Sequence, residues 1–161
     1  MIRAATTDDA AAIVAIYNHY VLHTTISFET EAVSSAQMAQ RIADVQAAGL
    51  PWLVLEQDGV LLGWAYATRW RVRHAYRFAV EVSVYLHPEA GGHGYGFALY
   101  QQLFAQLQAL GIHCVIGGIA LPNPASVALH EKMGMRQVAH FQEVGFKQDR
   151  WLDVGYWQRV F

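Results

Sequence analysis

The segment from Phe78 to Tyr100 constrains the fold more than any other, because a strand pattern runs there into a glycine cluster and then into a helical pattern. Side chains alternate between the two faces of an extended chain. One face of the expected strand is apolar and carries Val80, Val82, Val84 and Leu86. The other face is polar and carries Glu81, Ser83 and Tyr85. The segment therefore predicts a strand with a chemically usable face, then a loop, then a helix.

The loop between strand and helix begins after Pro88, which ends the strand pairing, and it contains Gly91, Gly92, Gly94 and Gly96. Glycine lets the backbone approach a ligand closely, and the first turn of a helix offers unpaired N–H groups that attract a phosphate. The dinucleotide motif G-x-G-x-x-G is excluded, because its third glycine would fall on Phe97 or Leu99, and no G-K-[ST] follows. We interpret the loop as a phosphate or pyrophosphate site, with a mobile turn as the alternative.

Composition narrows the class of protein. The 161 residues, 54% hydrophobic, fit one domain spanning residues 1–161 with one substantial core. A net charge of −2 without a basic stripe argues against a nucleic-acid partner. No signal sequence or bilayer-length apolar run is present, so we expect a soluble, cytoplasmic protein without membrane contact. Cys114 lies in an apolar run and is expected to be a buried, inert thiol.

Metal binding is not expected. His19 and His23 have the i, i+4 spacing of two ligands on one helical face, but no H-E-x-x-H motif, cysteine pair or nearby carboxylate completes a site.

Periodicity along the whole chain predicts the order β-α-α-β-β-β-α-β-α-β-β. Helices are expected after Thr7-Asp8-Asp9, from Ser34 or Ser35 to about Ala48, from Gly94–Gly96 to Gly111, and after Leu121-Pro-Asn-Pro. Strands are expected at 2–5, 52–56, 60–68, around Glu81, and at 114–120, 136–144 and 151–160, with a polar connection over 70–77. The pattern predicts an α/β fold: one mixed, mostly antiparallel sheet with helices on both faces.

This order, with a glycine loop after the fourth strand and Asn123-x-x-Ser126 after the fifth, resembles the GNAT superfamily of acyl-CoA-dependent N-acetyltransferases. Four further motifs are similar to the phosphinothricin N-acetyltransferase family, which includes methionine sulfoximine acetyltransferases. They are W-x-x-R-x-A-Y from Trp70, V-E-x-S-V-Y from Val80, L-P-N-x-x-S-V-x-x-H-E from Leu121 and G-F-K-x-x-x-W-x-D-V-G-Y-W-Q from Gly145.

The resemblance implies acetyl-CoA as cosubstrate, no metal, a small amino-acid-like acceptor and a homodimer. It implies that Glu81 and His130 form the acid–base pair. It implies cofactor contacts at Val84, Tyr85, Leu86, Gly92, His93, Gly94, Tyr95, Gly96, Phe97, Asn123 and Ser126. It implies that Phe28, Arg71, Arg73 and Lys147 surround the acceptor. Two positions depart from the family pattern: Gly91 replaces the usual Arg or Gln of the loop, and Ala79 replaces the usual threonine before the glutamate.

The residues themselves support this chemistry. Acetyl transfer needs a neutral amine, and partial burial would raise the pKa of Glu81 enough to make it a base. The alternative is a structural ion pair between Glu81 and an arginine. His130 could protonate the leaving thiolate, with a helix-cap or core histidine as the alternative, and Tyr85 is a second candidate donor that is more often packing.

The dense basic segment from Arg69 to Arg77 has two interpretations. Its guanidinium groups could bind carboxylates or phosphinates of the acceptor in bidentate fashion, or they could be solvated charges of a surface loop. The expected activity is transfer of acetyl from acetyl-CoA to the α-amino group of phosphinothricin, methionine sulfoximine or a related small amino acid. The alternatives are a non-catalytic acyl-CoA sensor and a GNAT enzyme acting on a different small amine.

Overall fold

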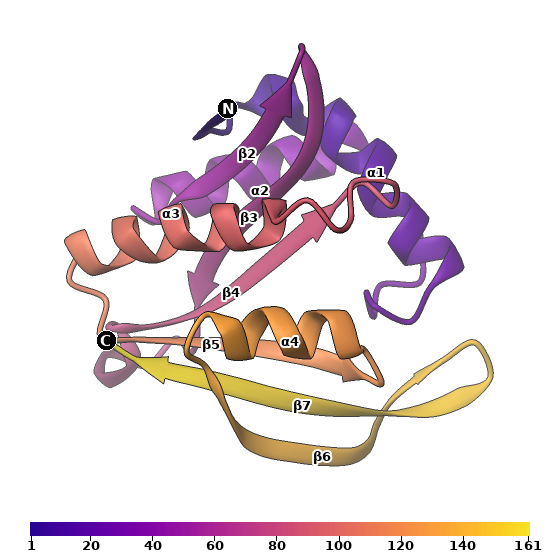
Figure 1. Cartoon of the computed structure of the whole chain (residues 1–161), viewed down its shortest axis with the longest axis vertical. Helices are drawn as coiled ribbons and strands as arrows, with labels where there is room; N and C mark the ends of the chain where they lie inside the picture. Colours follow the sequence, from indigo (N-terminus) through magenta and orange to yellow (C-terminus); the bar gives the residue numbers. More distant parts are fainter.

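One seven-stranded sheet organises the chain, in the order β1-β2-β3-β4-β5-β7-β6 (Figure 1). The structure is a computed structural model that describes residues 1–161. The strands are β1 (Ile2–Ala4), β2 (Trp52–Gln57), β3 (Val60–Arg69), β4 (Ala79–Leu86), β5 (Cys114–Leu121), β6 (Arg136–Lys147) and β7 (Arg150–Val160). All neighbours pair antiparallel except β4 and β5, which are parallel. The expected mixed, mostly antiparallel sheet is confirmed.

Four helices cover the two faces of this sheet: α1 (Ala10–His23), α2 (Ser35–Ala47), α3 (Tyr95–Ala109) and α4 (Pro124–Lys132). Figure 1 shows α3 and α4 in front of the sheet, and the hydrophobic contacts place α1 and α2 against its other face. The expected cap of the second helix is confirmed, because Ser34 Oγ accepts a hydrogen bond from the Gln37 amide at 3.1 Å.

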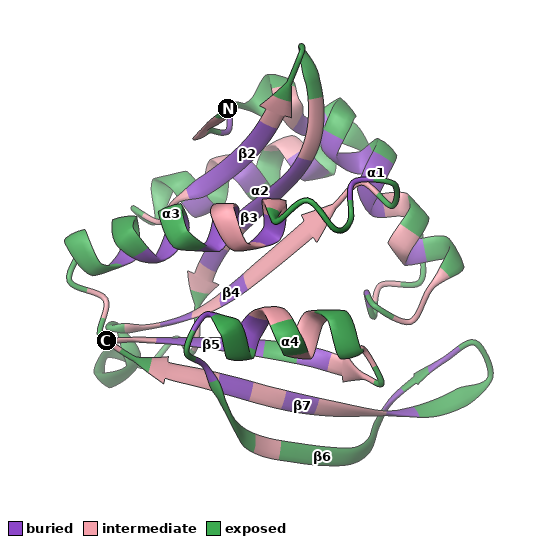
Figure 2. Cartoon of the chain, viewed as in Figure 1, coloured by how far each residue is buried: buried purple, intermediate pink, exposed green.

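Two apolar layers sandwich the sheet, and alternation along each strand assigns residues to them. On the α3 side, Leu99, Leu103 and Leu107 are fully buried against residues such as Val80 and Val115. On the other side, the buried residues include Ile13, Ile42, Trp52, Val54 and Trp64. Figure 2 shows the buried positions along the inner sides of the helices and the centre of the sheet. Each such side chain contributes about 1.5–3 kcal/mol on burial, so the sheet is a rigid platform for a site.

One local expectation needs correction, and two are confirmed with added detail. α1 begins at Ala10, directly after Thr7-Asp8-Asp9 as expected, with Asp9 as its N-cap residue, and Thr7–Asp9 themselves form a 3-10 turn capped by Thr6. The polar connection over 70–77 contains a second 3-10 turn, His74–Tyr76. Cys114 is half-buried rather than buried, because it is the first residue of β5.

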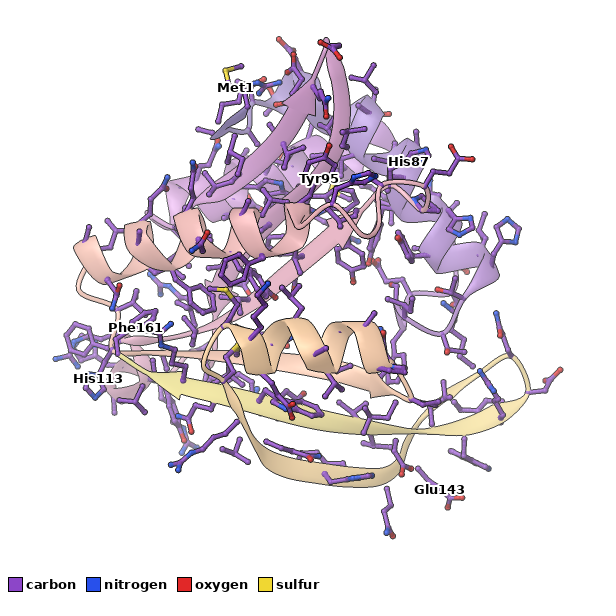
Figure 3. The ribbon with its side chains drawn as sticks, in the orientation of Figure 1. Met1, His87, Tyr95, His113, Glu143 and Phe161 are labelled. Atoms are coloured by element: carbon purple, nitrogen blue, oxygen red, sulfur yellow. The ribbon has the colours of Figure 1, made fainter.

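The two ends of the molecule differ in character. His87 and Tyr95 flank the glycine loop at one end, whereas His113 and Phe161 lie together at the other, where the Phe161 amide donates to the His113 carbonyl at 2.8 Å (Figure 3). No helix has the length and apolarity needed to cross a bilayer. No three His, Cys, Asp or Glu side chains gather as a metal site would require.

Candidate active site

A gap opens in the sheet between its two parallel strands. β4 pairs with β5 only from Ala79 to Glu81, opposite Cys114 to Ile116, whereas β4 pairs with β3 along its whole length. Beyond Glu81 the two parallel strands therefore diverge. A small cavity at this gap is lined by residues of both strands, Val82–Tyr85 and Gly118–Ala120, together with Ser126 and His130 of α4.

A larger cavity of about 860 Å³ lies on the α1/α2 face, over the part of the sheet that these helices leave uncovered. We call it the main cleft. Its floor includes Glu81 and Ser83 of β4 and Tyr156 of β7, and the loop between α1 and α2 forms one wall through Phe28 and Glu29. Ile26, Ser83, Tyr85, Gly118 and Ala120 line both the main cleft and the cavity at the gap, so the two spaces adjoin.

Glu81 is the acidic group on the floor of the main cleft. Burial raises the pKa of its carboxyl, and the positive charge of Arg71 opposes that rise. The ion pairs of the chain lie elsewhere and none includes Glu81, so the structural ion pair considered above is not formed. A half-buried carboxylate without a partner, beside a cavity, has the properties of a general base.

The loop between α1 and α2 is held by a network of polar side chains. Lys147 Nζ donates to the Ser27 carbonyl at 2.5 Å, and Arg41 binds both carboxylate oxygens of Glu29 at 2.6 and 2.9 Å. The Tyr17 hydroxyl donates to Glu29 and is 2.9 Å from Ser27 Oγ. Burial raises the pKa of Tyr17 and lowers that of Lys147. These contacts fix the wall of the main cleft that carries Phe28, whose ring lies directly over Gly145.

His130 is buried on the opposite face of the sheet from Glu81. Adjacent glycines of β5 make this visible: a Cβ on Gly117 would lie 2.8 Å from the His130 ring, and a Cβ on Gly118 would lie 3.5 Å from Glu81 Oε1. The Ser126 carbonyl, 2.7 Å from His130 Nδ1, can only accept, so Nδ1 carries the proton. Burial lowers the pKa of His130, and in the neutral ring Nε2 accepts from the hydroxyl of Tyr100 at 3.1 Å.

The glycine loop leads into α3 with backbone donors available. Gly94 is the N-cap residue, with a left-handed φ of 75°, and no side chain caps the first turn. Gly91 through Gly94 are exposed, so the free amides face solvent. A helix start of this kind binds anions through its N–H groups and its dipole.

Other sequence-predicted positions divide into those at a cavity and those away from one. Arg71 and Phe28 line the main cleft, whereas Arg73 and Lys147 line neither that cleft nor the gap. Val84, Tyr85, Asn123 and Ser126 lie at the gap, and Asn123 also caps α4 by accepting from the Ser126 amide. Tyr85 packs among Tyr17, Tyr20 and Trp64, with ring centroids 5.2–5.5 Å away, as its packing alternative predicts.

Sequence reasoning missed Tyr100 and the partners of Glu29. Tyr100 stands at a core position of its helix, and periodicity does not separate it from packing residues. The sequence did carry one signal that side chains crowd β5 on both faces, namely Gly117-Gly118 within an apolar strand, because glycines in a strand mark the close approach of other groups.

Comparison with known proteins agrees with this geometry. Residues 2–155 match the family described as an acetyltransferase (GNAT) domain. A phosphinothricin N-acetyltransferase of Alcaligenes faecalis is 43% identical over 159 residues, covering 98% of this chain and 81% of that protein. An L-methionine sulfoximine/L-methionine sulfone acetyltransferase of Salmonella typhimurium is 38% identical over 157 residues, covering 98% and 92%. The crystal structure of a phosphinothricin acetyltransferase from Sinorhizobium meliloti in complex with acetyl-CoA superposes with a TM-score of 0.96 at 39% identity, covering 100% and 88%.

Proposed function

The chain belongs to the GNAT family of acetyltransferases, and from that membership we propose that it acetylates the α-amino group of a small amino acid or an analogue of the phosphinothricin or methionine sulfoximine type. The observation that carries the proposal is the unpaired Glu81 carboxylate on the floor of a cleft that adjoins the gap between β4 and β5. Residues 1–161 act as one catalytic domain in this proposal.

The enzyme is an N-acetyltransferase that uses acetyl-CoA, which supplies an acetyl group activated as a thioester. The chain fits this donor, because strand divergence leaves the β4 backbone beyond Glu81 without β5 partners and the glycine loop has bare amides. We assign the pantetheine contacts to the backbone of Val84, Tyr85 and Leu86. We assign the pyrophosphate to the loop residues Gly92, His93, Gly94, Tyr95, Gly96 and Phe97, and further donor contacts to Asn123 and Ser126.

Glu81 is the general base of the proposed mechanism. Its raised pKa brings the carboxylate nearer to the basicity of an amine, so it accepts the ammonium proton directly or through a water and leaves the amine neutral. The positive charge of Arg71 opposes that rise in the pKa of Glu81 and so favours the ionised carboxylate.

His130 is the second member of the proposed acid–base pair, on the α4 side of the gap. His130 Nδ1 donates a hydrogen bond to the Ser126 carbonyl, and His130 Nε2 accepts one from the Tyr100 hydroxyl. Burial raises the pKa of Tyr100, so its hydroxyl keeps its proton and donates it in the hydrogen bond to His130 Nε2. Both side chains line the cavity at the gap, which supports a role close to the reacting thioester.

The acceptor lies in the main cleft, with Arg71 as the anchor for its carboxylate or second anionic group and Phe28 against its side chain. Lys147 contributes by holding the wall of the cleft through the Ser27 carbonyl. Arg73 is on the same exposed segment but lines neither cavity, so within one chain it is assigned no contact with the acceptor.

A homodimer in the cytoplasm is part of the proposal. The edge strand β6 and its partner β7 expose several large apolar side chains, including Phe146 at 57% and Trp151 at 62%. Apolar side chains gathered at a sheet edge favour burial against a second copy. A cytoplasmic location supplies acetyl-CoA, and sedimentation velocity at micromolar concentration tests the dimer.

The deciding experiment is thiol release from acetyl-CoA with a panel of acceptors: phosphinothricin, methionine sulfoximine, the common amino acids, a polyamine, an aminoglycoside and a lysine peptide. We expect turnover with one or both analogues, with the N-acetyl product identified by mass spectrometry. Efficient acetylation of a cationic amine with no response to either analogue would show that the cleft serves another substrate class.

A further inference from the structure

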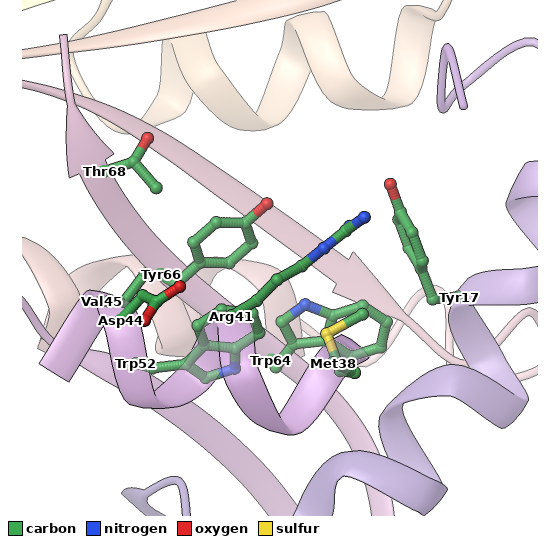
Figure 4. A pocket seen from close by; sticks show the side chains of 9 residues that line it. All are labelled: Tyr17, Met38, Arg41, Asp44, Val45, Trp52, Trp64, Tyr66 and Thr68. Atoms are coloured by element: carbon green, nitrogen blue, oxygen red, sulfur yellow. The ribbon is translucent and has the colours of Figure 1, made fainter. Parts of the chain in front are cut away.

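A third cavity, of about 270 Å³, lies between α2 and the sheet and shares only Tyr17 with the lining of the main cleft (Figure 4). We call it the side cavity. Its walls are Met38 and Val45 of α2 and the aromatic residues Trp52, Trp64 and Tyr66 of β2 and β3. No catalytic or binding role has been assigned above to any of these side chains.

The side cavity adjoins the main cleft on the same face of the sheet. Tyr17 lines both spaces. Thr68 of the side cavity is the register partner of Glu81, and Tyr66 is the register partner of Ser83. Opposite residues of an antiparallel pair have Cβ atoms about 4.5–5.5 Å apart, so the side cavity begins one strand away from the proposed base.

The partition between the two spaces is polar and partly exposed. Arg41 belongs to the side cavity and Glu29 to the main cleft, and they form an ion pair at 2.6 Å with side chains 44% and 35% exposed. Figure 4 shows Arg41 extended across the cavity toward Tyr17. Arg41 has a long side chain that is 44% exposed, so it can move toward solvent as a ring enters, while Tyr17 and Lys147 still hold the wall of the main cleft through Glu29 and the Ser27 carbonyl.

Aromatic side chains dominate the interior of the side cavity. Trp52 and Tyr66 stack on each other with ring centroids 4.2 Å apart at an interplanar angle of 11°, Trp52 and Trp64 are 2% and 1% exposed, and Tyr66 is the partly exposed ring that an entering group meets. The charged residues in the lining of the side cavity are Arg41 and Asp44, and both are exposed. The indole nitrogen of Trp52 is the buried side-chain polar atom that has no partner. Ligand pockets start at about 300 Å³, so this volume suits one substituent rather than a whole second ligand.

We propose that the side cavity is a specificity subsite that takes a large apolar side chain of the acceptor, of phenyl or benzyl size, while the amino group of the same molecule lies at Glu81. The inference rests on the proposed acetylation of amino acids in the main cleft. Aromatic walls bind such a ring through stacked and edge contacts, and the exposed rim leaves room for its entry.

The test compares kcat/KM for alanine, phenylalanine, homophenylalanine and methionine sulfoximine in four proteins. In the wild type we expect homophenylalanine to exceed alanine at least tenfold. Val45→Phe places a ring inside the side cavity and should lower that ratio at least tenfold. Val45→Met fills the space with a flexible chain and should lower the ratio less. Ala47→Phe adds the same ring at an exposed position of α2 and should leave the ratio within twofold of wild type.

Thermal unfolding of each variant establishes that it is folded, and Val45→Met supplies the test if Val45→Phe is not. Turnover of methionine sulfoximine with a homophenylalanine-to-alanine ratio near one in the wild type would overturn the subsite and leave the proposed function standing. Equal ratios in the folded Val45 and Ala47 variants would also overturn it. Absence of turnover with every amino acid would remove the proposed function and the subsite together.

Discussion

Restoring a side chain at position 91 should strengthen donor binding. The resemblance to the GNAT superfamily implies an Arg or Gln at the position of Gly91, yet the backbone does not require glycine there. A Cβ at Gly91 would meet no heavy atom within 4 Å, and its φ is not in the left-handed region, unlike those of Gly92 and Gly94. Gly91→Arg is therefore expected to fold without steric cost.

The magnitude follows from the exposed position of the loop. A hydrogen bond to a charged group contributes about 1.5–3 kcal/mol, and ordering a long side chain costs about 0.5–1.5 kcal/mol. The expected net gain is about 1 kcal/mol, or roughly a fivefold lower Kd for CoA. Titration calorimetry of CoA measures this directly. The gain should shrink at high salt, because the guanidinium and the phosphates remain near solvent.

Two controls separate charge from backbone effects. Gly91→Ala tests whether loss of glycine flexibility alone changes Kd, and Gly91→Gln supplies a neutral donor of similar reach. We expect affinities in the order Arg, Gln, then Ala and wild type together. Equal Kd values for the Arg and Ala variants would refute the placement of the pyrophosphate beside this residue.

Two further predictions concern the acceptor side. Glu81→Gln keeps the shape of the side chain but cannot accept a proton, so kcat/KM should fall about 10²-fold at pH 7. Because burial raises the pKa of Glu81, wild-type activity should fall as the pH drops through that raised pKa, and the same limb persisting in the pH profile of the variant would place the base elsewhere. Arg71→Ala should raise KM for the acceptor about tenfold with CoA affinity unchanged, since Arg71 lines the main cleft. Arg73→Ala is the matched control from the same segment, and an equal or larger effect there would mean that Arg73 reaches the acceptor by a route absent from a single chain.

Local patterns predicted the elements well because their causes are local. The alternation around Glu81 depends on neighbouring residues alone, as does the Ser34 cap. The expected strands at 52–56 and 60–68 are likewise joined by a local turn at Asp58-Gly59, with φ values of 53° and 77°. The start of α1 directly after Thr7-Asp8-Asp9 was predicted, but the 3-10 turn that Thr6 and Asp9 enclose with a capping box before it was not.

The long-range contacts between side chains of the site could not be predicted from local patterns. Lys147 reaches Ser27 across 120 residues, and Arg41 reaches Glu29 between a helix and a loop, so neither contact leaves a periodic trace. The separation of His130 and Glu81 by the sheet depends on which face of β5 α4 covers, which only the assembled topology decides.

The divergence of β4 and β5 divides the work of the protein between two surfaces. α3 and α4 belong to one side of the opening, and the α1–α2 loop with β6 and β7 belongs to the other. Substitutions that reshape the second side need not alter the first. A lineage can therefore change which amine it modifies while the side proposed to bind acetyl-CoA stays the same.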